Sequence, residues 1–172
     1  MGPHPYLDAP LPLAMAHRGG ATYGPNRGIE NTVRAFATAV DLGYRYLETD
    51  VRASRDGVPV VVHDDRLDRL CGAPVRVCDL DWHELSRLRV GGREPLPRLD
   101  DVLATFVELR LNIDVKSDDA VLPTLAALRS AHAEHRVCLA SFSDRRMRRI
   151  RRHAGPAVAT SLATGEVALL RV

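Results

Sequence analysis

The chain has 172 residues, of which 45% are hydrophobic and 27% are charged, with a formal net charge of +2. This length is about that of one domain, and the composition is too apolar for a disordered chain. So small a net charge gives little support to nucleic-acid binding, and no apolar run approaches the roughly 18 residues that cross a bilayer. We therefore expect one globular domain without stable membrane insertion.

The first twelve residues and the cysteines bear on the cellular location of the chain. Residues 1–12 contain four prolines and no positively charged cluster, so we interpret them as an N-terminal tail rather than a signal peptide, and residues 13–172 as the domain. The three cysteines, Cys71, Cys78 and Cys138, form no CxxC motif, which argues against a disulfide framework or a zinc ribbon. These features predict a reducing, cytoplasmic location.

Strand-like and helix-like segments alternate along the chain, which is typical of parallel α/β architecture. The strand segments are 13–16, 44–51, 58–63, 111–115, 137–141 and 157–161, and the helical segments are 33–42, 82–88, 100–108, 120–133 and 144–153. Asn31 or Thr32 can cap the first helix, and Gly43 ends it. Six strands are too few for a closed eight-stranded barrel, so the count alone also allows a doubly wound sheet.

The candidate reactive side chains lie where predicted strands end. They are His17 and Arg18 after the first strand, Glu48 and Asp50 at the second, His63 and Asp64 at the third, and Asp114 and Lys116 at the fourth. In a barrel of parallel strands these ends meet at one mouth, the usual place for an active site. This convergence favours the barrel over the doubly wound sheet.

Two acidic residues on the second strand suggest a metal site. Glu48 and Asp50 are two positions apart, so their side chains point to the same side of the strand. Asp114 from another strand would complete an all-oxygen group, which suits one hard divalent cation, Mg²⁺ or Ca²⁺. The short spacing by itself also fits a surface pair neutralised by Arg45 or Arg52.

Two histidines and two cations at the same predicted rim point to phosphate chemistry. His17 and His63 can act as general base and general acid, although either one alone also fits a structural histidine. Arg18 and Lys116, the only lysine among 24 lysines and arginines, can bind phosphate oxygens. The chain has neither a GxxxxGK[ST] loop nor a G-x-S-x-G elbow. The favoured reaction is therefore phosphodiester cleavage.

Eight short segments carry a resemblance to a known family. In order they are AHRGG (16–20), ENT (30–32), ETDV (48–51), DGVPVVVHD (56–64), LDR (67–69), LPRLDDVL (96–103), NIDVK (112–116) and ASFS (140–143). Together they resemble the glycerophosphodiester phosphodiesterase family. The resemblance implies a TIM-barrel enzyme that uses a divalent metal to hydrolyse glycerophosphodiesters to glycerol 3-phosphate and an alcohol.

The resemblance also implies roles for the matching residues. It makes His17 and His63 the acid–base pair, Arg18 and Lys116 phosphate contacts, and Glu48, Asp50 and Asp114 the metal ligands. Asp114 stands where the family commonly has glutamate, which shortens that ligand by one methylene group. Ile29 stands where a proline usually precedes the Glu-Asn-Thr segment.

The length departs from the family pattern, because a TIM barrel typically needs about 250 residues. We therefore predict an α/β fold of the TIM (β/α)8 type that is incomplete at its C-terminal side, with about six of eight βα units. Three explanations stay open: a fragment of an active enzyme, a short protein completed by self-association through open barrel edges, or an inactive family member.

Three alternative functions remain at this point. The nearest is a phospholipase D-like lyase of the same superfamily, in which a substrate hydroxyl attacks and a cyclic phosphate leaves. The second is a non-catalytic module that binds phosphate or metal. The third is nucleic-acid binding by the arginine run within 145–152, which lacks interleaved aromatic residues and is better interpreted as the solvated face of a barrel helix. We predict no nucleic-acid partner.

Overall fold

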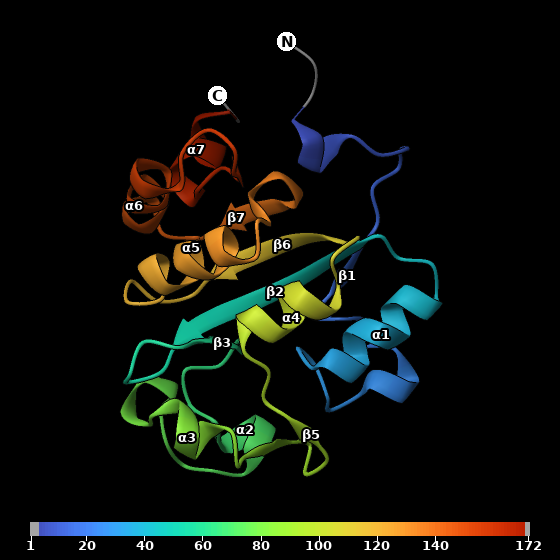
Figure 1. The fold of residues 1–172 in the computed structure, drawn as a ribbon, viewed down its shortest axis with the longest axis vertical. Helices are drawn as coiled ribbons and strands as arrows, with labels where there is room; N and C mark the ends of the chain where they lie inside the picture. Colours follow the sequence, from blue (N-terminus) through green and yellow to red (C-terminus); the bar gives the residue numbers. More distant parts are fainter. Residues whose placement is uncertain (1–3, 171–172) are drawn as a thin grey trace.

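The computed structural model describes residues 4–170, and residues 1–3 of the predicted tail lie outside this range. One open sheet runs through the molecule in the order β1-β2-β6-β7-β8, with β3 paired to β2 (Figure 1). Its strands are β1 (Met15–His17), β2 (Tyr46–Ala53), β3 (Pro59–Val61), β6 (Arg110–Val115), β7 (Val137–Ala140) and β8 (Ala159–Thr160). The pairings along the main path are all parallel, as predicted.

A helix follows each parallel strand, and all but the last of these helices pack buried side chains against one side of the sheet. They are α1 (Val33–Asp41), α4 (Leu99–Thr105), α5 (Val121–Ser130), α6 (Asp144–Ala154) and α7 (Thr164–Leu169). The core between strands and helices is aliphatic, with Leu47, Leu111 and Ile113 fully buried against helical residues such as Leu103 and Leu128. This burial of alternating apolar strand positions stabilises the layer by the hydrophobic effect.

The helix limits follow from local chemistry. Thr32 caps α1 by accepting a hydrogen bond from the Ala35 N–H at 3.2 Å. The chain leaves this helix through Gly43, whose φ of +94° suits glycine. Both features agree with the sequence. Helix α7 was not predicted, and each of its residues is at least partly exposed.

The segment predicted as the third parallel strand runs in the opposite direction. β3 pairs antiparallel with β2, with Val61 opposite Val51, after a tight turn at Gly57. Residues 4–170 therefore contain five βα units rather than six, because the strand predicted at 58–63 is the return arm of a hairpin. The reversal carries the chain back to the site end of β2, where the Val62 N–H donates to the Asp50 carbonyl at 3.0 Å.

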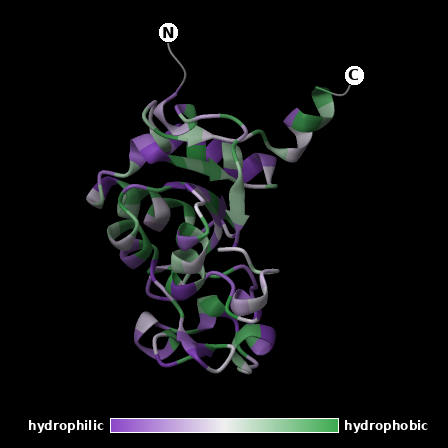
Figure 2. Ribbon diagram, turned by 90° about the vertical axis from the view of Figure 1, so that its right-hand side faces the viewer, coloured by the Kyte–Doolittle hydropathy of each residue, from purple (hydrophilic) through white to green (hydrophobic). Residues whose placement is uncertain are grey.

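Residues 62–98 form an insertion between β3 and α4, which Figures 1 and 2 show as a small lobe below the sheet. It contains α2 (Asp68–Cys71), α3 (Trp82–Leu85), β4 (Arg89–Val90) and β5 (Glu94–Pro95). Its apolar cluster, separate from the main core, consists of Val60, Val62, Leu67, Leu70, Val77, Leu85, Val90 and Leu96. The insertion thus has its own small hydrophobic core.

The N-terminal segment packs against the end of the sheet opposite the predicted site. Tyr6, in a 3₁₀ turn over Pro5–Leu7, is buried and meets Tyr46 edge to face with ring centroids 5.3 Å apart. Arg110 donates to the backbone carbonyls of Pro5 and Asp8 at 3.3 and 2.6 Å. The described part of the predicted tail is therefore held to the domain.

Three further features bear on the sequence predictions. No helix within residues 4–170 combines the length and the apolar character needed to cross a membrane. Cys71, Cys78 and Cys138 are free thiols. β1 and β8 are the two ends of the main path of the described sheet, and self-association through open edges stays a prediction.

Candidate active site

Strand register places the predicted carboxylates on one side of the sheet. Glu48 lies beside His17 on β1 and beside Asn112 on β6, and Asp50 lies beside Asp114. Positions two apart on a strand, and registered partners on parallel neighbours, point the same way. The side chains therefore form two adjacent rows that face the interior of the curved sheet.

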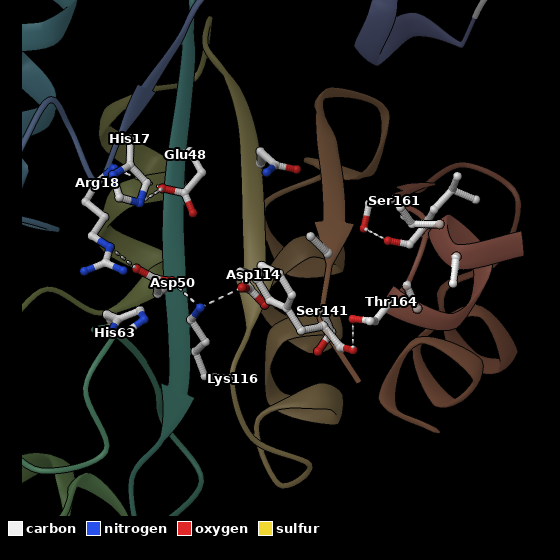
Figure 3. Close-up of a pocket in the computed structure, with 17 residues that line it drawn as sticks. His17, Arg18, Glu48, Asp50, His63, Asp114, Lys116, Ser141, Ser161 and Thr164 are labelled. Atoms are coloured by element: carbon white, nitrogen blue, oxygen red, sulfur yellow. Dashed lines mark hydrogen bonds and ion pairs between the residues drawn. The ribbon is translucent and has the colours of Figure 1, made fainter. Parts of the chain in front are cut away.

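A cavity of about 920 Å³ opens over these rows. Its lining includes all seven residues predicted from the sequence, namely His17, Arg18, Glu48, Asp50, His63, Asp114 and Lys116. Figure 3 shows the two histidines and Arg18 on one side of the cavity, with Ser141, Ser161 and Thr164 across it. The structure thus brings together side chains that lie up to 99 positions apart in the sequence, from His17 to Lys116.

Asp50 is at the centre of the charged groups and is only 1% exposed. Its Oδ2 accepts a hydrogen bond from Asn31 at 2.9 Å and forms an ion pair with Arg18 Nε at 3.1 Å. Its Oδ1 lies 3.0 Å from Lys116 Nζ. Two cations and an amide thus offset the cost of burying this carboxylate, and they fix its orientation.

Lys116 bridges two of the predicted metal ligands. Its Nζ lies 2.6 Å from Asp114 and 3.0 Å from Asp50 (Figure 3), and 5.7 Å from the centre of the Phe142 ring. Burial acts to lower the pKa of Lys116, but its hydrogen bonds to Asp114 and Asp50 outweigh this and raise it overall. The side chain is therefore an ammonium ion at neutral pH.

Glu48 has less positive charge around it than Asp50 has. Its Oε2 accepts the Arg18 backbone N–H at 3.0 Å and lies 3.8 Å from His17 Nε2. The left-handed backbone of Arg18, with φ at +51°, follows directly after β1 at this contact. Burial, and then the charge of Asp50, raise the pKa of Glu48 to about 7.

The three carboxylates fit a divalent cation by their chemistry. Among residues 4–170 no three His, Cys, Asp or Glu side chains already stand close enough to hold an ion, and Lys116 lies between Asp50 and Asp114. However, all the donors are oxygens, as Mg²⁺ and Ca²⁺ prefer. Burial is the main reason that the pKa of Glu48 is raised, and positive charge beside this carboxyl would lower it again.

His63 reaches the cavity from the junction between β3 and the insertion. Its Nδ1 lies 2.8 Å from Asp64 Oδ1, and its backbone carbonyl accepts from Arg52 Nε at 2.8 Å. Burial acts to raise the pKa of Asp64, but hydrogen bonds from Arg69 and His63 lower it overall. An ionised Asp64 favours the Nδ1–H tautomer of a neutral His63, in which Nε2 carries no proton.

The sequence analysis gave no role in the site to Glu30, Asn31 and Arg69, and it named Asp64 only as a candidate side chain where a strand ends. Asn31, with φ at +59°, donates to Asp50 and accepts from the Thr49 hydroxyl at 2.8 Å. The Glu-Asn-Thr segment was recognised as part of a family pattern, but Asn31 was considered only as a helix cap. Asparagine tolerates a left-handed backbone better than most residues, and this property is the signal that could have identified Asn31.

The arginine run on α6 is largely used inside the molecule. Met147 and Ile150 are buried, while Arg146 pairs with Asp118 at 2.9 Å and Arg151 pairs with Glu166 at 2.6 Å. Guanidinium groups held by carboxylates are less free to bind phosphates. The burial of Met147 and Ile150 in the main core agrees with the prediction of a barrel helix.

Comparisons with known proteins test the family resemblance. The model of the glycerophosphoryl diester phosphodiesterase family matches residues 17–168. A Mycobacterium tuberculosis protein named "Probable glycerophosphodiester phosphodiesterase 2" is 42% identical over 153 residues, which are 89% of this chain and 57% of that protein. The glycerophosphodiester phosphodiesterase of Caldanaerobacter subterraneus is 30% identical, over 83% of this chain and 63% of its own length.

A solved structure gives the same result for the fold. The crystal structure of a glycerophosphodiester phosphodiesterase from Agrobacterium tumefaciens has a TM-score of 0.74 and 27% identity, over 86% of this chain and 65% of that one. The likeness confirms the predicted fold class, an incomplete TIM-type barrel. The chain spans less than two thirds of the length of these relatives. Since the family model covers nearly the whole described chain, the chain belongs to the glycerophosphoryl diester phosphodiesterase family.

Proposed function

We propose that this chain carries the site of a metal-dependent hydrolase that converts glycerophosphodiesters to glycerol 3-phosphate and an alcohol. One observation carries the proposal: His17 on β1 and His63 after β3 line one cavity together with two cations and three carboxylates. The names of the relatives support the choice of substrate. The charge pattern supports phosphate chemistry, because a phosphodiester gains negative charge on its oxygens in the transition state.

Arg18 and Lys116 are the proposed phosphate contacts. Arg18 uses Nε for Asp50 and Nη1 for Glu30, so Nη2 is the donor proposed for a phosphate oxygen. Lys116 supplies a point charge at the same rim, and it is positioned by Asp50 and Asp114. Both cations would stabilise negative charge more strongly in this partly buried cavity than in water.

The two histidines are the proposed proton carriers. One accepts a proton from the attacking water while its oxygen forms the new bond to phosphorus. The other donates a proton to the alcohol oxygen while the old phosphorus–oxygen bond breaks. The Asp64 contact suits His63 to this role because it leaves Nε2 for the transfer. His17 is well exposed to the cavity and lies 3.8 Å from Glu48.

The proposed metal ligands are Glu48, Asp50 and Asp114. A Mg²⁺ or Ca²⁺ ion held there would act as a Lewis acid toward the phosphoryl oxygens. Lys116 would then have to give up part of its contact with Asp50 and Asp114.

The test is product formation by the full chain from glycerophosphocholine with Mg²⁺ or Ca²⁺, followed by phosphorus NMR. We expect glycerol 3-phosphate, no product after EDTA treatment, and a loss of at least about 100-fold in His17→Ala and in His63→Ala. His83→Ala, at an exposed histidine of the insertion, is the matched control and should keep full activity.

Three outcomes would contradict the proposal. Full activity in either site variant would exclude that histidine from proton transfer. A persistent cyclic phosphate would show that a substrate hydroxyl attacks, as in a phospholipase D-like lyase. Binding of the diester without any product would leave a phosphate-binding or metal-binding module.

A further inference from the structure

The two histidines belong to parts of the molecule that are stabilised separately. His17 ends β1, whose Ala16 lies in the main hydrophobic core. His63 follows β3 at the start of the insertion, whose apolar side chains form their own cluster. The position of one imidazole relative to the other therefore depends on contacts between the insertion and the rim of the sheet.

A chain of alternating charges connects these two parts. Arg69, on α2 of the insertion, donates from Nε to Asp64 at 2.8 Å, and Asp64 in turn holds His63. The two amino groups of Arg69 donate to both oxygens of Glu30, at 2.9 and 2.8 Å. The same Glu30 accepts from Arg18 Nη1 at 3.0 Å.

Glu30 is the residue that connects the insertion side of this series of contacts to Arg18. Its side chain is only 11% exposed, and it accepts from two guanidinium groups, one directly after β1 and one on α2 of the insertion. The double contact with Arg69 is bidentate, which fixes direction as well as distance. The hydrogen bonds from Arg69 are the main reason that the pKa of Glu30 lies below its usual range. Glu30 is therefore an anion at neutral pH.

We propose that Glu30 and Arg69 are positioning residues that couple His63 to Arg18 across the junction between the insertion and the sheet. The inference rests on the proposed function, because it assigns His63 to proton transfer and Arg18 to phosphate. Neither Glu30 nor Arg69 lines the cavity. They act through the orientation of the two residues that do.

The consequences for kinetics differ between the two positions. Arg69→Gln leaves Arg18 in place but removes the support of Asp64, so kcat falls about ten- to a hundred-fold and KM changes little. Glu30→Gln weakens the contacts with both Arg69 and Arg18, so kcat falls similarly and KM rises as well. Arg69→Lys keeps the charge but loses the planar fork, and its kcat lies between those of wild type and Arg69→Gln. Combining Glu30→Gln with Arg69→Gln should lower kcat no further than Glu30→Gln alone, since both substitutions interrupt the same series of charged contacts.

The matched control is Arg66→Gln. Arg66 lies just before α2, is 55% exposed against 53% for Arg69, and pairs only with the nearby Asp68 at 3.0 Å within the described residues. It should keep the kinetic constants of the wild type. Thermal unfolding of each variant shows whether it is folded at the assay temperature.

A second measurement does not depend on activity. Nitrogen-15 NMR of the imidazole rings should show His63 in the Nδ1–H form in the wild-type chain and in Arg66→Gln. In Arg69→Gln and Glu30→Gln the two tautomers should be mixed. If the wild-type chain hydrolyses no diester, the proposed function fails, and the NMR comparison still decides the positioning role. Unchanged kcat and unchanged His63 signals in Glu30→Gln, or equal losses in Arg66→Gln, would overturn the proposal.

Discussion

Glu48, Asp50 and Asp114 lie on strands inside the sheet, whereas His63 lies at the junction between β3 and the insertion. β2 and β6 are joined by six consecutive registered pairs, so the carboxylates are positioned by backbone hydrogen bonds and a buried aliphatic core. His63 depends instead on charged side chains, namely Asp64 and the half-exposed Arg69. Exposed ion pairs contribute little stability. The two halves of one site should therefore respond differently to perturbation.

The largest difference between the two parts should appear when a buried aliphatic side chain is truncated in each. Ile113 on β6 and Leu85 on α3 are both 0% exposed. Ile113→Ala should lower the free energy of unfolding of the whole chain by about 2–5 kcal/mol, measured in urea. Leu85→Ala should open mainly the insertion, so that hydrogen exchange accelerates in residues 62–98 while β6 stays protected. Uniform loss of protection in both variants would contradict a separate insertion.

Asn31→Ala should have a smaller effect, focused on the carboxylates. The substitution removes a donor to Asp50 and an acceptor for Thr49, and it leaves buried polar groups unpaired. We expect a loss of about 2 kcal/mol in unfolding free energy and a fall in kcat. Asn26→Ala is the control, because Asn26 is equally buried but donates to backbone carbonyls of Gly19 and Ala35. If Asn26→Ala reduces kcat as much, Asn31 has no special link to Asp50.

The smallest expected effect is the acid response of the link between the two parts. Arg69 holds the pKa of Glu30 below its ordinary value of 4.5. An acid with a lowered pKa in the folded state stabilises the fold above its unfolded pKa, and this contribution is lost as the pH falls through the folded pKa. Between pH 5 and the acid limit of folding, wild type should lose more stability than Glu30→Gln. Parallel curves would show that Glu30 is not held in this way.

Much of the fold was predictable because local patterns decide it. The helix expected at 144–153 is α6 (Asp144–Ala154), and its buried Met147 and Ile150 are the residues that face away from the arginines. The strand at 58–63 was correctly predicted, but its direction was not. A period of two shows that a segment is extended and does not show which neighbour it pairs with. The short turn ending at Gly57 was the available signal for a hairpin.

The site was predictable where residues lie at the ends of strands. His17, Glu48 and Asp114 meet at one cavity because parallel strands bring their ends together. The supporting residues were not predictable by the same reasoning. Glu30 and Arg69 are 39 positions apart, and neither is at the end of a parallel strand. Their contact depends on how the insertion folds back on the rim, which no local pattern contains.

Lys116 has a practical consequence through its place between Asp50 and Asp114. It is the only lysine, so its side chain and the α-amino group are the only amines that acylating reagents can modify. Such reagents attack neutral amines, and a protonated one clamped by two carboxylates reacts slowly. The rate at which Lys116 is acylated, followed by mass spectrometry, would therefore measure how often its contacts with Asp50 and Asp114 open. Acylation of this one side chain can therefore be used to follow the state of the cavity.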